Sequence, residues 1–397
     1  MGVPRPAGAL WTLRYRAGVS ATGEQRSWRF RLHRAYRRFG PAVSRVVTVE
    51  ELVDAGRCEW IEVDPAAPFP RPSTRWVGGP APGLDPLDLL PAEVPAVGVI
   101  HMADVRVDGH QGWILTGGGA AIADSSWFGR DLPHRAQVPR QAPLSRHLTG
   151  TTVALCTEFA HGNYGHVLYD LIPRLDLLEQ SGLRFDQVDT VLCNVGGARR
   201  RMIEELGIPM EKVVWTDRLH TYRCDRLIAT TFPGVRRGLT ERAAQFLRHR
   251  LPIEPSRRDR RLYIPRRTSR IVANEHDLLP ILERHGFEVF DPTGLSSGRM
   301  PRSTFASAVA VVGGHGAGLA DIVFSPPGTR LMELLPTDHP EPYYMAAAAA
   351  VGADHRYLTT ASTSTRAPED WRARDAAVTV ELDAFAQAID ELVDGLP

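Results

Sequence analysis

Short apolar runs alternate with amphipathic segments through the middle of the chain. The apolar runs, several of them β-branched, predict strands at 152–156, 190–193 and 226–230. Leucines and other apolar residues at helical spacing predict helices at 164–180, 198–206 and 239–250. This order is typical of βαβ units, which build sheets of parallel strands.

The same alternation returns between residues 260 and 358. It predicts strands at 262–264, 287–290, 308–312 and 330–335. Helices are predicted at 274–285 and 302–307, and a glycine-rich loop at 313–318 leads into a further short helix. Prolines and charges at 252–259 indicate a linker between the two zones. We therefore predict an α/β fold with two facing, doubly wound Rossmann-type domains, at 146–255 and 256–360.

The two flanks of these zones have a different pattern. Residues 1–145 are predicted to be irregular, with short strands near 112–116 and 120–123, because nine prolines fall between Pro65 and Pro95. Residues 361–397 are predicted to be a polar tail that ends in an amphipathic helix.

Residues 26–39 carry six arginines and a stripe of aromatic and aliphatic residues at helical spacing. They predict a basic amphipathic helix. Such a helix either packs on its own domain or contacts a membrane surface or an acidic polymer.

The overall charge is close to neutral, but the arginines are unevenly placed. The 397 residues include 47 Lys+Arg and 46 Asp+Glu, a net charge of +1, which argues against a nucleic-acid-binding protein. Seven arginines lie within 257–270, and Lys212 is the only lysine of the chain. Either genomic codon bias or a need for bidentate oxyanion contacts accounts for this preference.

The cysteines and the N-terminal residues indicate the cellular compartment in which the protein is expected. The cysteines have no C-x-x-C spacing and lie in or near apolar stretches, so buried, reduced thiols are expected at Cys58, Cys156, Cys193 and Cys224. The first residues lack the apolar core of a signal peptide. We expect a cytoplasmic protein, with a peripheral contact at the inner face of the membrane if residues 26–39 bind there.

The glycine-rich segment 313–318 is the most informative motif. It lies between a predicted buried strand and a helix, so its backbone N–H groups and the helix N-terminus are suited to bind an anion. His315 adds a side-chain donor inside the turn. The spacing matches neither the dinucleotide G-x-G-x-x-G pattern nor a Walker loop. The alternative is a plain connection between strand and helix.

Arg266 and Arg270 follow the first strand of the same zone. In a parallel sheet they would lie at the same edge as the glycine turn, where ligands bind. Guanidinium groups form bidentate hydrogen bonds with phosphate oxygens, so a diphosphate is the expected ligand; a solvated basic loop is the alternative. Glu333, at the end of the strand 330–335, is a candidate for binding a ribose diol, or else an exposed carboxylate.

His166 and Asp170 stand four residues apart on the helix predicted at 164–180, and therefore on one face. A carboxylate orients an imidazole and raises its basicity, which suits a general base acting on a hydroxyl. The alternative is a buried polar pair that only pins the helix. No metal site is expected, because His161 has the wrong spacing from His166 and no D-x-D motif occurs.

Taken in order, these motifs resemble the glycosyltransferase 61 family, which includes capsular-polysaccharide biosynthesis proteins of bacteria. The resemblance covers about residues 100–340. The residues that carry it are Gly162-Asn163, His166, Asp170, Pro173-Arg174, Tyr263-Ile264, Arg266, Arg270, Asn274-Glu275, the block 314–319, Phe324, Pro327-Gly328 and Glu333.

The resemblance implies a GT-B fold of two Rossmann domains and inverting sugar transfer from a nucleotide-sugar donor. It implies that the donor nucleotide lies at Arg266, Arg270, Asn274, Glu275, His315, Gly316, Ala317 and Gly318. The predicted activity is a metal-independent, cofactor-free glycosyltransferase, hexosyl or pentosyl, acting on a hydroxyl of a glycan, glycolipid or small molecule. Two alternatives are a non-catalytic module that binds sugar nucleotides or glycans and a scaffold of a polysaccharide-assembly complex.

Overall fold

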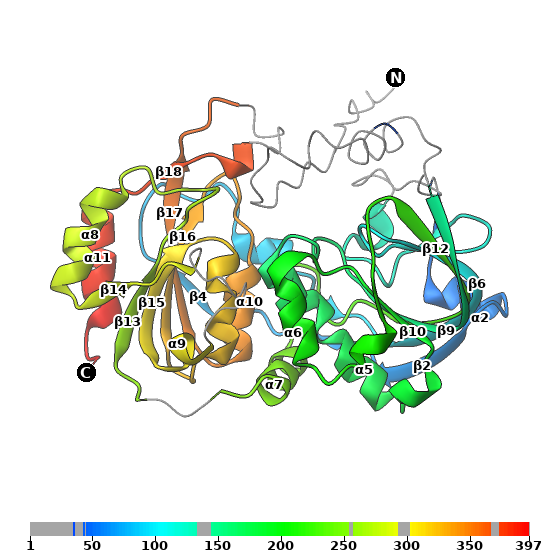
Figure 1. Cartoon of the computed structure of the whole chain (residues 1–397). Coiled ribbons are helices and arrows are strands. Elements are labelled where there is room, and N and C mark those ends of the chain that lie inside the picture. The colour runs from blue at the N-terminus through cyan, green and yellow to red at the C-terminus, as the bar shows by residue number, and fades with distance from the viewer. Residues whose placement is uncertain are drawn as a thin grey trace, which may run out of the picture.

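The computed structural model of the chain describes residues 35, 43, 45–132, 144–253, 257–292, 302–366 and 373–396. Two sheets lie side by side, and helices fill the space between them (Figure 1). The helix predicted over 26–39 lies outside the described residues, apart from Ala35. Within the described ranges, no helix has the length and apolar character needed to cross a membrane.

The first sheet has nine strands in the order β1-β8-β7-β6-β12-β9-β10-β11, with β2 paired to β6. β9 pairs in parallel with β10 and β12, whereas β12 is antiparallel to β6. The sheet is therefore mixed, and only part of it has the predicted Rossmann pattern. Its strands are β1 (Val46–Val47), β2 (Glu59–Asp64), β6 (Val97–Asp108), β7 (Ile114–Leu115), β8 (Ala121–Ile122), β9 (Leu144–Leu155), β10 (Thr190–Cys193), β11 (Val213–Trp215) and β12 (His220–Thr230).

Alternating side chains of this sheet enter two apolar clusters. Val153 and Leu155 of β9 face the helices between the sheets, while Ala154 faces the outer cluster. The inner helices are α5 (Arg174–Gln180), α6 (Arg200–Glu204) and α7 (Glu241–Arg250), and α2 (Val49–Asp54) covers the outer face.

The second sheet has seven strands in the order β14-β13-β15-β16-β17-β18, with β4 paired to β17. All the pairings are parallel except that of β18 with β17. The strands are β4 (Thr74–Trp76), β13 (Arg260–Ile264), β14 (Phe287–Val289), β15 (Ala308–Gly314), β16 (Arg330–Pro336), β17 (Asp354–Ser362) and β18 (Val378–Thr379).

Helices cover both faces of this sheet, as in a doubly wound fold. Tyr263 packs with α8 (Glu275–Arg284) and α11 (Leu382–Val393) on the outer face. Its neighbours Leu262 and Ile264 join the inner cluster, which includes α9 (Arg302–Ala306), the 3₁₀ helix η9 (Ala317–Phe324) and α10 (Tyr343–Ala350). That cluster also contains the inner helices of the first sheet, so the two halves share one apolar core.

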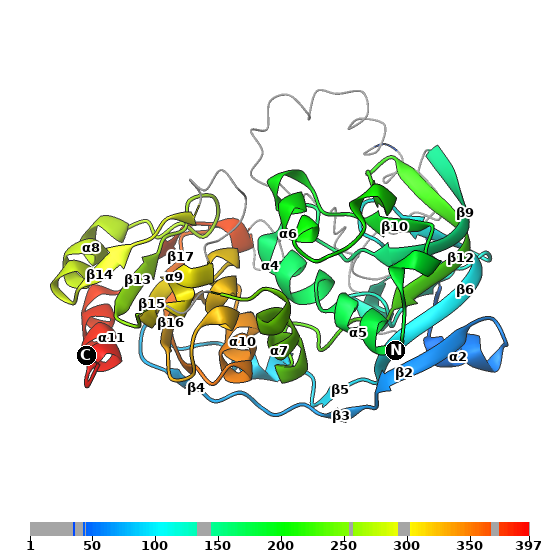
Figure 2. The ribbon, with the colours of Figure 1, turned by 60° about the horizontal axis from the view of Figure 1, so that its bottom comes forward.

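The proline-rich segment joins the two sheets. From β2 the chain runs through β3 (Ala67–Pro68), adds β4 to the edge of β17, and returns through β5 (Glu93–Val94) to β6 (Figure 2). The prediction of an irregular region up to residue 145 is wrong for residues 97–108, which form a central 12-residue strand. Prolines mark only the crossing, and the apolar run after Pro95 carries none.

The seven strands predicted from apolar runs are all present, several of them longer than expected. The helix predicted at 164–180 is instead broken into α4 (Tyr164–His166), a π-helical turn at Val167–Leu171 and α5. Pro173 lacks the N–H that a continuous helix would use. Short 3₁₀ turns lie at Pro86–Leu89, Gly129–Asp131, Phe185–Gln187, Gly197–Arg199, Met210–Lys212 and Ala373–Asp375.

Candidate functional site

The two motifs predicted to carry chemistry lie next to each other in space. The loop after β9 leads into α4, and the glycine turn after β15 leads into η9. A Cβ built on Gly165 would lie 3.9 Å from the Cβ of Ala317 and 3.8 Å from that of Ala320. The turn that bears His166 therefore packs directly on the helix that follows the glycine turn.

His166 is held in place by one residue that precedes it in the turn and one that follows it. The side-chain oxygen of Asn163 accepts hydrogen bonds from the backbone N–H groups of Gly165 (2.9 Å) and His166 (3.4 Å). The Nδ1 atom of His166 lies 2.5 Å from Oδ2 of Asp170. The Asp170 side chain is buried, but that of His166 keeps 16% exposure. The predicted His–Asp contact is present, with Nε2 left for an outside group.

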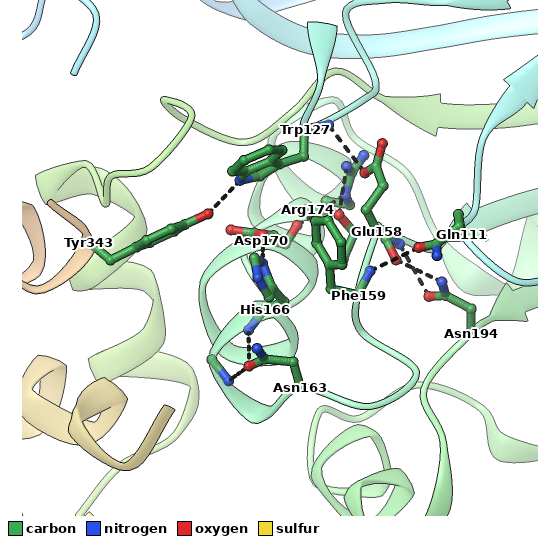
Figure 3. A network of polar contacts seen from close by, with 12 residues as sticks. Gln111, Trp127, Glu158, Phe159, Asn163, His166, Asp170, Arg174, Asn194 and Tyr343 are labelled. Carbon is green, nitrogen blue, oxygen red and sulfur yellow. Dashed lines mark hydrogen bonds and ion pairs between the residues drawn. The ribbon is translucent and has the colours of Figure 1, made fainter. Parts of the chain in front are cut away.

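Three aromatic rings surround His166 (Figure 3). Their centroids lie 4.7 Å (Phe159), 5.8 Å (Tyr343) and 6.5 Å (Trp127) from that of the imidazole. All three are half-buried. Phe159 has a φ of +66°, which is unusual for a bulky residue; strained residues of this kind cluster at functional sites.

Glu158 fixes the loop that carries Trp127. Its buried carboxylate accepts hydrogen bonds from the backbone N–H of Trp127 (3.1 Å), the indole of Trp113 (2.9 Å) and the hydroxyl of Ser126. Burial raises the pKa of Glu158, although these hydrogen bonds oppose the rise. The Glu158 side chain thus supports, from the protein interior, the aromatic wall that Trp127, Phe159 and Tyr343 form around His166.

Arg174 ties the His166 turn to the first sheet. Its buried guanidinium donates to the carbonyl of Asp170 (3.1 Å), that of Ser125 (2.9 Å) and the hydroxyl of Thr230 (3.1 Å). These acceptors come from three separate segments. Arg174 therefore has a supporting role behind the site.

Arg266 lies on the glycine turn. Its guanidinium donates to the carbonyl (3.1 Å) and hydroxyl (2.8 Å) of Ser269, and a Cβ on Gly316 would lie 2.1 Å from its Nη1. Arg270 donates from Nε to the carbonyl of His315 at 3.1 Å. The predicted juxtaposition of both arginines with the turn is therefore present, at the carboxyl edge of β13 and β15.

His315 has a buried carboxylate partner. Its Nδ1 lies 2.5 Å from Oε1 of Glu333, and its ring contacts those of His339 (5.2 Å between centroids) and Tyr344 (5.3 Å). The prediction that Glu333 binds a ribose is wrong, because its side chain has no exposed surface and both its oxygens contact histidines.

Asn274 and Glu275 are also engaged within the protein. The Asn274 amide donates to the carbonyl of Val380 (2.9 Å) and accepts from its N–H (3.1 Å). Glu275 accepts from the Tyr263 hydroxyl (2.9 Å) and from Arg267 (2.6 Å). Both residues thus help to hold the start of α8, and their predicted contact with the donor stays a prediction.

Asp321 lies where the two halves meet. It is fully buried, and its Oδ1 accepts a 2.7 Å hydrogen bond from the hydroxyl of Tyr164. Its Oδ2 has no hydrogen-bond partner among the described residues. Burial raises the pKa of Asp321 to about 7, despite the opposing hydrogen bond from Tyr164 and the nearby Arg302.

The aromatic residues of the candidate site were not predicted from the sequence. Tyr343 and Tyr344 precede an alanine run, a pattern that could have predicted α10. Trp127 comes from a loop in the segment expected to be irregular, and only its proximity in the fold reveals its role. Phe159 could have been found, because it follows a strand end where ligands commonly bind.

A comparison with known proteins supports the family resemblance. Residues 164–332 match the model of a family described as Glycosyltransferase 61. No curated protein gives a significant match. The matched segment includes His166, Arg266 and His315 and ends one residue before Glu333. The family assignment made from the sequence is therefore confirmed over this segment.

Proposed function

The chain carries a glycosyltransferase 61 segment at residues 164–332, and from this premise we propose that it moves a sugar from a nucleotide-sugar donor to a hydroxyl acceptor. The single observation that carries the proposal is the packing of the His166 turn against the helix that follows the glycine turn. It brings a candidate base and a candidate anion site together at one place.

The proposed arrangement is GT-B-like. In support, the loops that bear His166 and the glycine turn each follow the carboxyl end of a strand, one in each sheet. In open sheets with helices on both faces, ligands bind at that edge. A donor held by one half would therefore meet an acceptor held by the other.

The donor diphosphate is proposed to lie against Arg266, Arg270, His315 and the backbone amides of 316–318. Two guanidinium groups and an imidazole surround this turn, which suits a doubly charged group. As the bond to the sugar breaks, negative charge grows on the departing diphosphate, and preorganised donors stabilise it. The proposed reaction is therefore metal-independent, and arginine side chains take the place of a metal ion.

His166 is proposed to remove the proton of the acceptor hydroxyl. Asp170 fixes the imidazole through Nδ1 and leaves Nε2 to accept that proton. The oxygen then attacks the anomeric carbon as the diphosphate leaves on the opposite side, and this single displacement inverts the configuration. The half-buried rings of Trp127, Phe159 and Tyr343 would form the wall of the acceptor site.

The test is a panel of nucleotide sugars assayed for transfer and for donor hydrolysis, with and without a chelator. His166→Ala and Arg266→Ala should each reduce turnover strongly. Arg267→Ala is the matched control, because Arg267 is in the same loop but pairs with Glu275 and Asp291. Donor binding without turnover would instead indicate a non-catalytic module, and loss of turnover with chelator would contradict the metal-free reaction.

A further inference from the structure

The loop between β12 and α7 carries an arginine, Arg237, that reaches from the first half of the molecule to the second. β12 pairs in parallel with β9, so this loop leaves the same edge of the first sheet as the loop that bears His166. The Cζ atom of Arg237 lies 5.5 Å from the ring centroid of Trp127, which is part of the aromatic wall around His166. Its Nε lies 2.5 Å from Oε2 of Glu341, in the second half.

Glu341 lies in the segment that joins β16 to α10, and this segment contacts both candidate sites. Two residues before Glu341, the ring of His339 contacts that of His315. Two residues after it, the ring of Tyr343 contacts that of His166. The ion pair of Glu341 is therefore close to the candidate base and to the candidate anion site.

The guanidinium of Arg237 keeps donors for an outside group. Its Nε donates to Glu341, whereas Nη1 and Nη2 form no hydrogen bond within the part of the chain that the structure describes. The Arg237 side chain keeps 19% exposure, against 11% for that of Glu341. The N–H groups of a guanidinium form a planar fork, and the acceptor that fits this fork is an oxyanion.

The backbone at Arg237 is strained. Its φ is +64°, at the third position of a β-turn over 235–238 in which the last N–H donates to the first carbonyl at 3.2 Å. Glycine or asparagine normally fills such a position. Of the three other non-glycine residues with a positive φ in the described ranges, Phe159 and Arg270 lie at the candidate site. Strained residues cluster at functional sites, so the side chain accounts for an arginine here better than the turn does.

We propose that Nη1 and Nη2 of Arg237 bind the distal phosphate of the donor, the one that carries the sugar. This rests on the proposed function, in which Arg266 and Arg270 hold the diphosphate from the second half; Arg237 reaches it from the first half. The distal phosphate is bonded to the anomeric carbon, which must face His166 in the proposed reaction. It is therefore the part of the diphosphate nearest to the aromatic wall, where Arg237 lies. Glu341 fixes the guanidinium through Nε and is a positioning residue.

Positive charges from both halves lie beside His315. Burial lowers the pKa of its neighbour His339 well below the usual value, and Arg270 and Arg237 are among the positive charges that lower it further. Glu341 offsets the charge of Arg237. Arg237 therefore contributes hydrogen-bond donors of fixed direction more than net charge, and these suit a phosphate whose charge the other arginines balance.

Calorimetry on the full chain tests this contact. The probes are the common nucleoside diphosphates and the monophosphate of the nucleoside that binds the wild type best. Arg237→Gln should weaken diphosphate binding on the order of tenfold or more and leave monophosphate binding within about twofold. Arg236→Gln is the matched control, because Arg236 stacks on the same Trp127 ring, at 4.5 Å, but pairs with Asp131. It should leave both affinities unchanged.

Glu341→Gln tests the positioning role. It should weaken diphosphate binding by less than Arg237→Gln does and leave monophosphate binding unchanged. An ion pair that only joined the two halves would not distinguish the two probes. Equal affinities of Glu341→Gln and the wild type for the diphosphate overturn the positioning role of Glu341.

Two results with Arg237→Gln overturn the proposal: an equal loss of diphosphate and monophosphate affinity, or no loss of either. A loss confined to nucleotide sugars that carry a carboxylate would assign Arg237 to the sugar and overturns it as well. If Arg266→Ala weakens diphosphate binding and Arg237→Gln does not, this inference fails and the proposed function stands. If neither variant weakens it, or no nucleotide binds the wild type, both fail.

A second variant decides if Arg237→Gln does not fold. In the double variant Arg237→Gly/Glu341→Gln, glycine suits the φ of +64° and no carboxylate is left without its partner. The double variant should show the same loss for the diphosphate and the same unchanged affinity for the monophosphate. Wild-type affinity for the diphosphate in this variant overturns the proposal.

Discussion

The indole of Trp127 donates a 2.6 Å hydrogen bond to the hydroxyl of Tyr343. Trp127 follows β8 of the first sheet, whereas Tyr343 begins α10 of the second half. Both rings contact His166, so this one hydrogen bond closes the aromatic wall across the two halves. Tyr344, the next residue of α10, contacts His315. The start of α10 therefore contacts both His166, the candidate base, and His315, in the candidate anion site.

Tyr343→Phe should weaken the acceptor site without removing the base. The lost hydrogen bond is worth about 0.5–1.5 kcal/mol, so the acceptor KM should rise roughly two- to tenfold at saturating donor. Trp127→Phe should have a similar effect on the acceptor KM. Because the two side chains act through one hydrogen bond, the double variant should be little worse than either single one. Fully additive effects would show that the two rings act separately.

Substitution of His166 should affect turnover more than donor binding. General base catalysis contributes about 10²–10⁴-fold, so His166→Ala should lower kcat by a factor in that range. Asp170→Asn should give a smaller loss, since the imidazole remains but loses its orienting carboxylate. His147→Ala is the control, because His147 forms an exposed contact of the same type with Asp225. A kcat unchanged in His166→Ala would assign the base to another residue.

Much of the fold could be predicted, because apolar periodicity reports burial directly. The strand Thr190–Cys193 is where the pattern predicted it, and the short apolar run of β15 indicated a buried strand. The crossing through β4 could not be predicted, since three residues after a proline-rich run carry no periodic signal. The partners of Glu333 were hidden for a related reason: His315 and His355 lie on other elements, 18 and 22 residues away in sequence.

Contacts of the candidate site could be predicted where they join residues close in sequence. The contact of His166 with Asp170 follows from helical spacing alone, even though Asp170 lies in a π-helical turn. For Glu333 the residue type suggested an exposed ligand contact, and only the neighbouring strands show that it is buried. Residue spacing identifies pairs within one element, whereas pairs between elements depend on the packing.

Gly316→Ala tests whether Arg266 must lie on the glycine turn. The added Cβ would lie 2.1 Å from Nη1, so the guanidinium would have to move away from its present position. A side-chain end moves at little cost, but Gly316 has a φ of +154°, which alanine rarely adopts, so a loss of stability of about 1–3 kcal/mol is expected from backbone strain. Loss of charge-assisted hydrogen bonds to the diphosphate, each about 1.5–3 kcal/mol, should weaken donor binding on the order of tenfold or more, measured by calorimetry.

Gly286→Ala is the matched control for this substitution. Gly286 also has a positive φ, of +71°, but an added Cβ would meet nothing within 4 Å. It should show the cost of backbone strain alone, a small loss of stability with unchanged donor affinity. Equal donor affinities in the two variants would mean that the position of Arg266 on the turn is not required.

Asp321 should make the protein less stable as the pH rises from about 4 to 7. Its carboxyl has a pKa of about 7 when folded, because it is buried, against about 3.9 in an unfolded chain. Between these values the folded state holds a proton that the unfolded state has released. Stability therefore falls with rising pH, by about 1.4 kcal/mol per pH unit at most, and levels off once the folded carboxyl is also ionised.

Asp321→Asn removes this titration while keeping an oxygen that can accept the hydrogen bond from Tyr164. Urea unfolding of both proteins between pH 4.5 and 8 should show the variant gaining stability relative to the wild type as the pH rises. The quantity to follow is the difference in free energy of unfolding between Asp321→Asn and the wild type, because other groups also change stability with pH. Glu333 acts in the opposite sense: its pKa is lowered, so its contribution to stability is lost on acidification. Asp186→Asn, at an exposed carboxylate, should leave the pH dependence close to that of the wild type. Parallel curves for wild type and Asp321→Asn would mean that Asp321 is ionised in the folded state throughout, and that its charge is compensated where the two halves meet.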